Sequence, residues 1–237
     1  MIIIHEVPGI TPLVSAFART VSDHSMTAVL PSLFGTPGRS PSTRSIATSV
    51  AQVCISREFT MFATNKTSPV VRFLRELAAH EHVTYPGPGV GVVGMCLTGG
   101  FALAMSVEPS VVAPVLSQPS LPVGWRADQR RALGLRDDDL RLVKNRTNEG
   151  LCVLGLRFTG DHVSPGERFD RLRDELGAQF IGVEIDSTPM NPWGYQPKAH
   201  SVLTEDYSDA PGSPTREALT TVLAFLTTRL GVAPPPT

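Results

Sequence analysis

The stretch that decides the fold runs from Val90 to Gly100 and reads V-G-V-V-G-M-C-L-T-G-G. Its first half is dense in valine, which is typical of a strand buried on both faces of a parallel sheet. Glycines follow at Gly94, Gly99 and Gly100, and an apolar helical pattern begins directly after them. Because small neighbours permit a strained turn between strand and helix, this pattern can present the middle residue, Cys96, as a nucleophile above the sheet.

Cys96 also has a plainer interpretation, since a free cysteine at the end of a buried strand often packs as a small apolar side chain. The surrounding glycines favour the nucleophile. The amino end of the following helix would stabilise both a thiolate and an oxyanion formed by its attack. Cys54 lies in a helix or loop pattern and Cys152 in a strand pattern, so both are predicted to be packing residues.

Outward from this stretch, short apolar runs alternate with longer amphipathic segments, which predicts strands alternating with crossover helices in a parallel sheet. The expected strands are Met1 to Ile4, Thr27 to Leu30, Val90 to Val93, Val111 to Val115, Leu151 to Phe158 and Phe180 to Ile185. The expected helices are Thr11 to Val21, Ser68 to His82, Leu97 to Val107, Gly166 to Leu176 and Thr215 to Leu230. We expect one α/β domain over residues 1–231 and a proline-rich tail over residues 232–237.

Two segments interrupt this alternation. Residues 31–57 are rich in Gly, Pro, Ser and Thr and are predicted to form a long loop with a helix after Arg44. Residues 118–150 are polar and charged, and a solvated helical face is the plain interpretation of such a charge run. Because they lie between the nucleophile and the next candidate residue, we also expect a small helical insertion there that would act as a lid.

Charge and hydropathy argue against several partners. The chain has 21 basic and 22 acidic residues and a net charge of −1, so no broad positive field favours nucleic acid or an anionic membrane. Apolar runs are far shorter than the roughly 20 residues that cross a bilayer. Met1 to Ile4 lacks the basic segment that precedes a secretion signal. We therefore expect a soluble cytoplasmic protein, either a monomer or a homodimer.

The cysteines and histidines predict neither a disulfide framework nor a metal site. Three cysteines are an odd number and too few for such a framework in a chain of 237 residues. No C-x-x-C or H-x-x-x-H spacing typical of zinc ligands occurs. We expect no metal and no cofactor.

A nucleophile needs a base, and the base needs an orienting acid. In α/β-hydrolases these follow in the order nucleophile, acid, base, at the carboxyl ends of strands. Asp161 comes just after the expected strand ending at Phe158, and His200 follows the last expected strand after a proline-rich loop. The order Cys96, Asp161, His200 fits this scheme. The competing base, His162, is adjacent to Asp161 and would not easily adopt the required loop geometry.

With these residues in place, the chain resembles the dienelactone hydrolase family of α/β-hydrolases, cysteine-nucleophile enzymes that open enol-lactones and related esters. The resemblance extends from Met1 to about Leu230. The family's G-x-C-x-G-G elbow is similar to Gly94-x-Cys96 followed by Gly99-Gly100 with one extra residue, or with Thr98 replacing the elbow's last glycine. The acid motif resembles Asp161-His162-Val163-Ser164-Pro165, and the G-H-S base motif resembles Ala199-His200-Ser201.

The resemblance also assigns a glutamate. Family members carry it straight after a strand in a segment like E-x-x-G, which is matched by Glu6 to Gly9. This implies that Glu6 holds the Cys96 thiol in the resting enzyme and accepts its proton when substrate arrives. The backbone N–H groups of Val7 and Leu97 would form the oxyanion hole. The plain alternative for Glu6 is an ordinary loop carboxylate or helix-cap partner.

The chain also departs from the family. It begins at what would be the family's third strand, so we expect a mostly parallel sheet of about six strands with helices on both faces. Two arginines that bind the substrate carboxylate are replaced by Thr36, two residues after Phe34, and by Thr204. The resemblance makes Phe34, Thr36 and Thr204 substrate contacts. Without a bidentate clamp, dienelactone itself is doubtful as a substrate, although Arg39 or Arg44 could substitute.

We therefore expect hydrolysis of a small-molecule ester or lactone through an acyl-thioester on Cys96, with His200 as base and Asp161 as orienting acid. The alternative is a binding or sensing protein on the same fold that hydrolyses nothing efficiently. A third hypothesis is a redox and glyoxalase-like family in which a glutamate also contacts an elbow cysteine. There a histidine commonly follows the cysteine, whereas Leu97 follows here.

Overall fold

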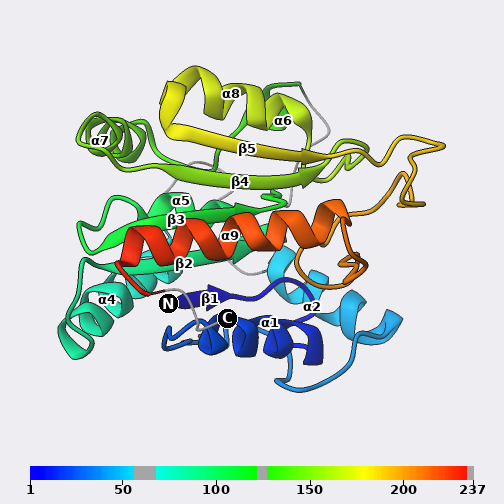
Figure 1. Cartoon of the computed structure of the whole chain (residues 1–237), viewed down its shortest axis with the longest axis horizontal. Coiled ribbons are helices and arrows are strands. Elements are labelled where there is room, and N and C mark those ends of the chain that lie inside the picture. Colours follow the sequence, from blue (N-terminus) through cyan, green and yellow to red (C-terminus); the bar gives the residue numbers. More distant parts are fainter. Residues whose placement is uncertain (56–67, 122–126, 234–237) are drawn as a thin grey trace.

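The computed structural model describes residues 1–55, 68–121 and 127–233, and its centre is a parallel sheet (Figure 1). The sheet has five strands in the order in which they occur along the chain. They are β1 (Ile2–Ile4), β2 (Val90–Met95), β3 (Val111–Ser117), β4 (Val153–Phe158) and β5 (Phe180–Ile185). Every residue of β1 and β2 is buried, which explains why these segments are apolar without alternation.

Parallel register brings the carboxyl ends of the central strands to one edge of the sheet. Ile4 pairs with Gly94, and Met95 pairs with Ser117. The segments that follow β1, β2 and β3 therefore meet at this edge, and the segments after β4 and β5 lie next to them. Candidate residues far apart in the sequence are collected here.

The segment from Thr27 to Leu30 is not a strand of this sheet. Val29 forms an isolated parallel bridge with Ile2; its N–H donates to the Met1 carbonyl at 2.8 Å and its carbonyl accepts from Ile3 at 2.9 Å. Pro31 follows, and a proline has no N–H with which to extend a ladder. Among the described residues the sheet thus has five strands and one bridging segment, where about six strands were predicted.

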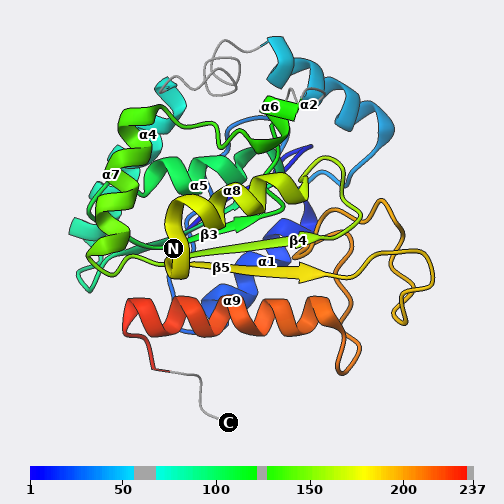
Figure 2. The same cartoon turned by 90° about the horizontal axis from the view of Figure 1, so that it is seen from above.

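Helices cover both faces of the sheet, as the sequence predicted (Figures 1 and 2). On one face lie α1 (Pro12–Asp23) and α9 (Pro214–Leu230), which pack with the side chains of Ile3 and Val93. On the other lie α4 (Pro69–Thr84), α5 (Gly99–Met105), α7 (Asp137–Asn148) and α8 (Gly166–Leu176), which pack with Ile2 and Ile4. The remaining helices are α2 (Thr43–Ile55), α6 (Ala127–Arg131), η1 (Cys96–Thr98) and η2 (Gly177–Gln179).

Local signals fix several helix ends. Thr11 accepts the N–H of Val14 at 3.2 Å, and Ser68 accepts that of Val71 at 3.3 Å, each just before a proline in the first turn. The left-handed Gly231 ends α9 at φ 62°. These three helix ends lie within one residue of the predicted ends at Thr11, Ser68 and Leu230. The helix expected after Arg44 is α2.

The segment predicted as an insertion contains the crossover helix between β3 and β4. Leu140 and Val143 of α7 belong to the core. Ion pairs tie its polar face to neighbouring helices, with Arg75 to Asp139 at 2.9 Å and Lys144 to Glu175 at 2.8 Å. The charge run is therefore in large part the outer face of a regular layer helix. A lid stays a prediction, since residues 122–126 lie outside the described part of the chain.

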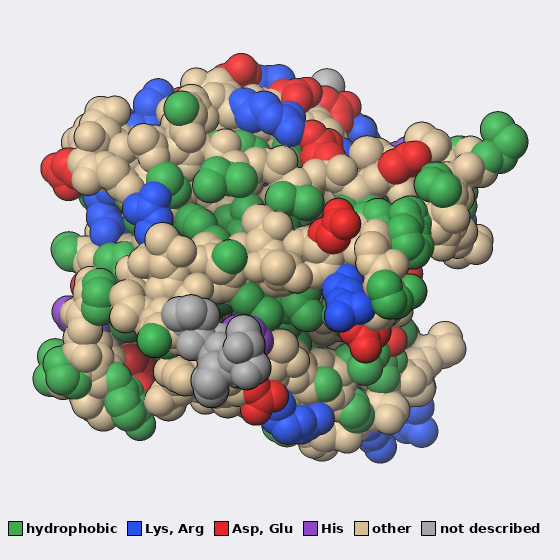
Figure 3. Space-filling model, viewed as in Figure 1, with side chains coloured by type: hydrophobic (Ala, Val, Ile, Leu, Met, Phe, Trp, Pro, Cys, Tyr) green, Lys and Arg blue, Asp and Glu red, His purple; other side chains and the backbone are tan. Residues whose placement is uncertain are grey.

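The surface reflects the near-neutral composition. On the face shown in Figure 3, basic and acidic side chains are interspersed and do not gather into a patch of one sign. Among the described helices, none combines the length and the apolar character that a membrane crossing requires.

Candidate active site

Cys96 lies on a sharp turn directly after β2. Its φ is +56°, a conformation that residues with a Cβ rarely adopt. The turn needs small neighbours, because a Cβ at Gly94 would lie 2.2 Å from the Thr98 carbonyl oxygen and one at Gly99 would lie 2.7 Å from the Pro119 Cα. The strained turn that the sequence predicted is thus present.

Thr98 occupies the place of the elbow's last small residue and contributes bonds that glycine lacks. Its side chain is fully buried. The hydroxyl oxygen accepts the Met95 N–H at 2.9 Å and lies 2.9 Å from the Ile4 carbonyl and 2.8 Å from the Met95 carbonyl. The hydroxyl therefore ties the turn that holds Cys96 to the end of β1.

This arrangement predicts that Thr98→Val lowers the free energy of unfolding by about 2 kcal/mol, because the isosteric change leaves buried backbone groups without their partner. Thr98→Ser should retain most of the stability. Urea denaturation measures both. Thr147→Val is the control, because that hydroxyl donates only within its own helix, to the Lys144 carbonyl at 2.7 Å. Equal stability of Thr98→Val and the unchanged protein would contradict the assigned bonds.

Asp161 and His200, which follow β4 and β5 in the chain, come together in the structure. His200 Nδ1 lies 2.6 Å from Asp161 Oδ2. Asp161 is buried, and its Oδ1 accepts the N–H groups of Val163 at 2.8 Å and Ser164 at 3.2 Å. His162, the competing base in the sequence, is exposed. The carboxylate therefore pairs with His200.

His200 also interacts with Cys96. Burial lowers the pKa of His200, but the negative charge of a Cys96 thiolate and the hydrogen bond to Asp161 outweigh it and raise the pKa well above the usual 6.5. Its other ring nitrogen, Nε2, is buried and has no hydrogen-bond partner among the described residues. That nitrogen is the one available for proton exchange with the thiol or with substrate.

Glu6 lies just after β1 and is only 4% exposed. Its Oε2 accepts hydrogen bonds from Gln118 Nε2 at 3.1 Å and from Ser201 Oγ at 2.8 Å, and its Oε1 accepts one from Thr204 Oγ1. None of these three donors is the Cys96 thiol. Thr204 is thus turned toward the protein's own carboxylate.

The other predicted contacts lie around the loop after β1. Phe34 packs edge-on against His5 with ring centroids 4.4 Å apart. Thr36 is exposed beside a cavity of about 120 Å³ whose lining includes Arg39. Val7 lies in the loop after β1, next to Glu6, and Leu97 directly follows Cys96. The oxyanion hole and the substrate contacts stay predictions.

Sequence reasoning missed Asp206. Its Oδ2 accepts hydrogen bonds from the backbone N–H groups of His200 at 2.8 Å and Ser201 at 2.9 Å. Asp206 therefore stabilises the loop that carries the His200 imidazole. The only signal was an aspartate six residues after the histidine in a short polar loop, which is too common to be specific.

Two buried arginines were missed as well. Arg157 of β4 donates to the Ser164 carbonyl at 2.8 Å and pairs with Glu184, so it braces the loop that carries Asp161. Arg168 of α8 donates to the Pro119 carbonyl at 2.7 Å, and burial lowers its pKa to about 10. Nothing in the local sequence around these two arginines indicates that their guanidinium groups will be enclosed.

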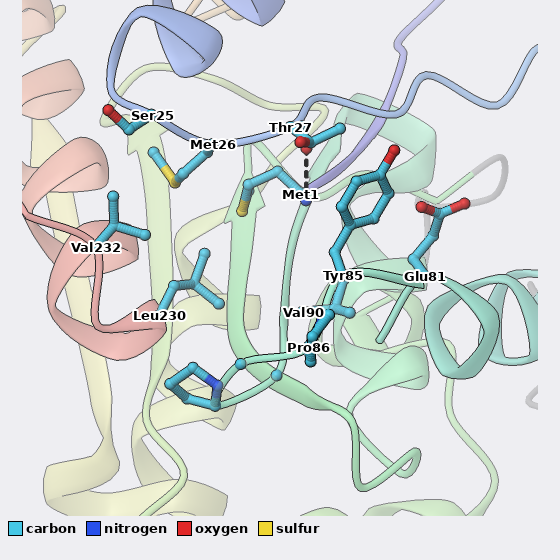
Figure 4. A pocket seen from close by; sticks show the side chains of 13 residues that line it. Met1, Ser25, Met26, Thr27, Glu81, Tyr85, Pro86, Val90, Leu230 and Val232 are labelled. Carbon is cyan, nitrogen blue, oxygen red and sulfur yellow. Dashed lines mark hydrogen bonds between the residues drawn. The ribbon is translucent and has the colours of Figure 1, made fainter. Parts of the chain in front are cut away.

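Cys152 and one further cavity lie away from this site. Cys152 is half-buried and contacts Gln179, whereas the Cys54 side chain lies outside the described part of the chain. A cavity of about 270 Å³, lined by residues that include Met1, Tyr85 and Leu230, lies at the amino ends of β1 and β2 (Figure 4). It is therefore at the opposite edge of the sheet from Cys96. Among the described residues, no group of three or more His, Cys, Asp or Glu side chains could hold a metal ion.

Comparisons with known proteins identify the fold. No protein-family model and no curated protein sequence matches the chain. A Klebsiella pneumoniae structure provisionally described as a dienelactone hydrolase is 16% identical; the match covers 97% of this chain and 85% of that one, with a TM-score of 0.58.

Two further solved structures agree. A 2,6-dihydroxy-pseudo-oxynicotine hydrolase is 14% identical over 100% of this chain and 63% of its own, with a TM-score of 0.52. A monoacylglycerol lipase from Paleococcus ferrophilus is 12% identical over 94% and 93%, with a TM-score of 0.50. The chain therefore has the α/β-hydrolase fold.

Proposed function

We propose that this α/β-hydrolase-fold protein is a hydrolase that cleaves a small ester or lactone through Cys96, His200 and Asp161. The observation that carries the proposal is the strained Cys96 turn beside a half-buried histidine, His200, whose Nδ1 lies 2.6 Å from the carboxylate of a buried aspartate. Each residue follows a different strand of one parallel sheet. This is the arrangement that nucleophilic catalysis needs on this fold.

The proposed reaction has two steps. The Cys96 thiolate attacks the carbonyl carbon and forms a tetrahedral oxyanion, which the backbone N–H groups of Val7 and Leu97 stabilise. As the carbon–oxygen bond breaks, His200 gives its Nε2 proton to the leaving alkoxide, and an acyl-thioester remains. His200 then takes a proton from water while the hydroxide attacks the thioester, which releases the acid and restores the thiolate. Throughout both steps the Asp161 carboxylate accepts a hydrogen bond from the Nδ1–H group of His200.

Glu6 is the residue for which the resemblance implies an additional proton-accepting role. Glu6 is buried in the loop after β1, directly before Val7, and this position supports a role in catalysis. Its carboxylate already accepts three hydrogen bonds, from Gln118, Ser201 and Thr204. These bonds leave one acceptor site, on Oε1, and none of the three donors is the Cys96 thiol. We therefore propose His200 as the main partner of the thiol.

The proposed substrates are neutral. Neither Thr36 nor Thr204 supplies the guanidinium fork that clamps a carboxylate. Thr204 also donates to Glu6, and Glu205 and Asp206 follow it in the same loop, so negative charge gathers on this side of the site. This distribution disfavours a dienelactone carboxylate and is compatible with small uncharged esters.

The direct test uses p-nitrophenyl acetate. We expect continuous release of p-nitrophenolate and, on rapid acid quenching, an acetyl group on the Cys96 peptide detected by mass spectrometry. A series of esters and lactones that differ in acyl length and charge then defines the preference. Absence of both turnover and adduct across that series would refute the proposed activity.

The raised pKa of His200 predicts that its imidazole stays protonated above pH 6.5. Because the negative charge of Cys96 and the hydrogen bond to Asp161 raise this pKa, Cys96→Ala should lower it. NMR of the His200 ring protons against pH measures the change. An unchanged His200 pKa in Cys96→Ala would exclude the interaction with Cys96. A histidine in this place can take the thiol proton, so His200→Ala should also slow the alkylation of Cys96 by iodoacetamide at pH 7.

One observation favours the alternative, a binding or sensing protein. Cys96 is only 9% exposed and His200 Nε2 is buried, so access to the reacting atoms is narrow in this conformation. The same ester experiment separates the two functions. A stable acyl adduct that is not turned over would favour sensing, and multiple turnovers would favour hydrolysis.

A further inference from the structure

A cluster of buried polar side chains lies behind the proposed triad, and its key member, Gln118, has no part in the reaction steps above. Gln118 follows β3 directly and is 0% exposed. Its φ is +36°, in the left-handed region that residues other than glycine rarely enter. Such conformations persist only where the surroundings hold them, and they gather at functional sites.

Hydrogen bonds fix both ends of the Gln118 side chain. Its Oε1 accepts from the Ser117 hydroxyl, and its Nε2 donates to Glu6 Oε2 at 3.1 Å. A carboxylate can only accept, so the amide NH₂ must face Glu6 and the amide oxygen must face Ser117. The backbone N–H of Gln118 donates to the Leu156 carbonyl at 2.7 Å, which anchors the residue to β4.

From Glu6 the network continues to the base. Ser201 and Thr204 donate to the same carboxylate, and Ser201 is the next residue after His200. Glu6 therefore joins the loop that carries the imidazole to the loop after β1, and Gln118 joins both to β3.

A second connection reaches the nucleophile. Ser120 donates through its hydroxyl to the Gln118 carbonyl at 3.0 Å and through its N–H to the Cys96 carbonyl at 2.9 Å. Hydrogen bonds thus connect Gln118 to the backbone of Cys96 through Ser120, and to the loop that carries His200 through Glu6.

We infer that Gln118 is a positioning residue that, through Glu6, sets the placement of His200 relative to Cys96. The inference rests on the proposed function. In a buried site a carboxylate that loses one of its donors moves toward the donors that remain, which here belong to the His200 loop. Misplacing a catalytic group by about 1 Å costs about a hundredfold in rate.

The first test is Gln118→Leu, with Gln179→Leu as matched control. Gln179 is also hydrogen-bonded, but it accepts from Cys152 and lies away from the site. We expect Gln118→Leu to lower kcat for p-nitrophenyl acetate about 10- to 100-fold with KM within about twofold. The rate of Cys96 alkylation by iodoacetamide at pH 7 should also fall, because His200 is no longer placed to take the thiol proton. The control should change neither.

Gln118→Glu is the second variant and gives a signature that loss of packing would not. A carboxyl group at this position can donate to Glu6 only while protonated, so its activity relative to the unchanged protein should fall as pH rises. Glu205 is affected by the charges of Glu6 and Asp206, and His200 by those of Cys96 and Asp161. All these groups are present in both proteins, so a pH dependence of the ratio reports the new carboxyl group and its effect on them.

Three results would overturn the inference. One is a folded Gln118→Leu with unchanged kcat and unchanged alkylation rate, and another is an equal loss in Gln179→Leu. The third is a pH-independent activity ratio for Gln118→Glu. Alkylation needs no turnover, so the inference can be tested even if the proposed hydrolase activity fails. If Gln118→Leu does not fold, Ser201→Ala and Thr204→Val remove other donors to Glu6 and should lower the alkylation rate as well.

Discussion

Replacing Cys96 by alanine is expected to abolish ester hydrolysis, with a loss of about 10⁴-fold or more in kcat. The sulfur forms the covalent bond in the first step, and no side chain can replace it at this position. The turn places a single residue, at φ +56°, above the end of β2. Alanine fits that backbone, so the fold should persist and the loss should be chemical. Steady-state hydrolysis of p-nitrophenyl acetate measures it.

The control for Cys96→Ala is Cys152→Ala, which removes a half-buried thiol that contacts Gln179 and lies outside the site. Its activity should stay within about twofold of the unchanged protein, because it touches none of the proposed machinery. Activity that survives Cys96→Ala would show that another group performs the attack. It would also remove the acyl-thioester from the proposed mechanism.

Asp161→Asn is expected to cost about 10³- to 10⁴-fold in kcat while leaving the structure intact. Asp161 Oδ1 accepts two backbone N–H groups, from Val163 and Ser164, and an asparagine oxygen can keep both bonds. The asparagine NH₂ must then face His200 Nδ1, where Asp161 Oδ2 now lies at 2.6 Å. Two donors cannot bond, so the imidazole must move its proton to Nε2 and lose its ability to accept one there.

Asp174→Asn provides the matched control, since Asp174 is a mostly exposed carboxylate paired with Arg131 at 2.8 Å. Exposed pairs contribute little, so activity and stability should change little. Activity of Asp161→Asn above about a tenth of the original would argue that His200 does not work through this bond. The raised pKa of His200 provides a second readout, because losing the carboxylate should lower that pKa, as NMR of the ring protons would show.

The order of elements was readable from the sequence because it depends on local patterns. Valine-rich runs without alternation indicate strands covered on both faces, and Ser68-Pro69 or Leu230-Gly231 indicates where a helix begins or ends. Thr27 to Leu30 has the same local pattern as a strand, yet only Val29 bridges to its neighbour. Pairing depends on the partner's position, and no local pattern encodes that position.

For the candidate site too, some features could be predicted from the sequence and others could not. Cys96 could be found because glycines at fixed spacing are needed for its turn, and Asp161 and His200 because each follows a strand end in the required order. The partners of Glu6 could not be found. Gln118 is 112 residues away from Glu6 and Thr204 is 198 residues away, and glutamine and threonine have no property that indicates such a contact.

By itself the sequence determined the alternation of strands and helices, the turn at Cys96 and the positions of Asp161 and His200 after later strands. These follow from steric and hydrophobic constraints that act over a few residues. Only the tertiary structure decided that Thr98 bonds to the end of β1, that Thr204 faces Glu6 and that Gln118 contacts Glu6. Those contacts form where parallel register brings the carboxyl ends of separate strands to one edge of the sheet, so they depend on the packed sheet as a whole.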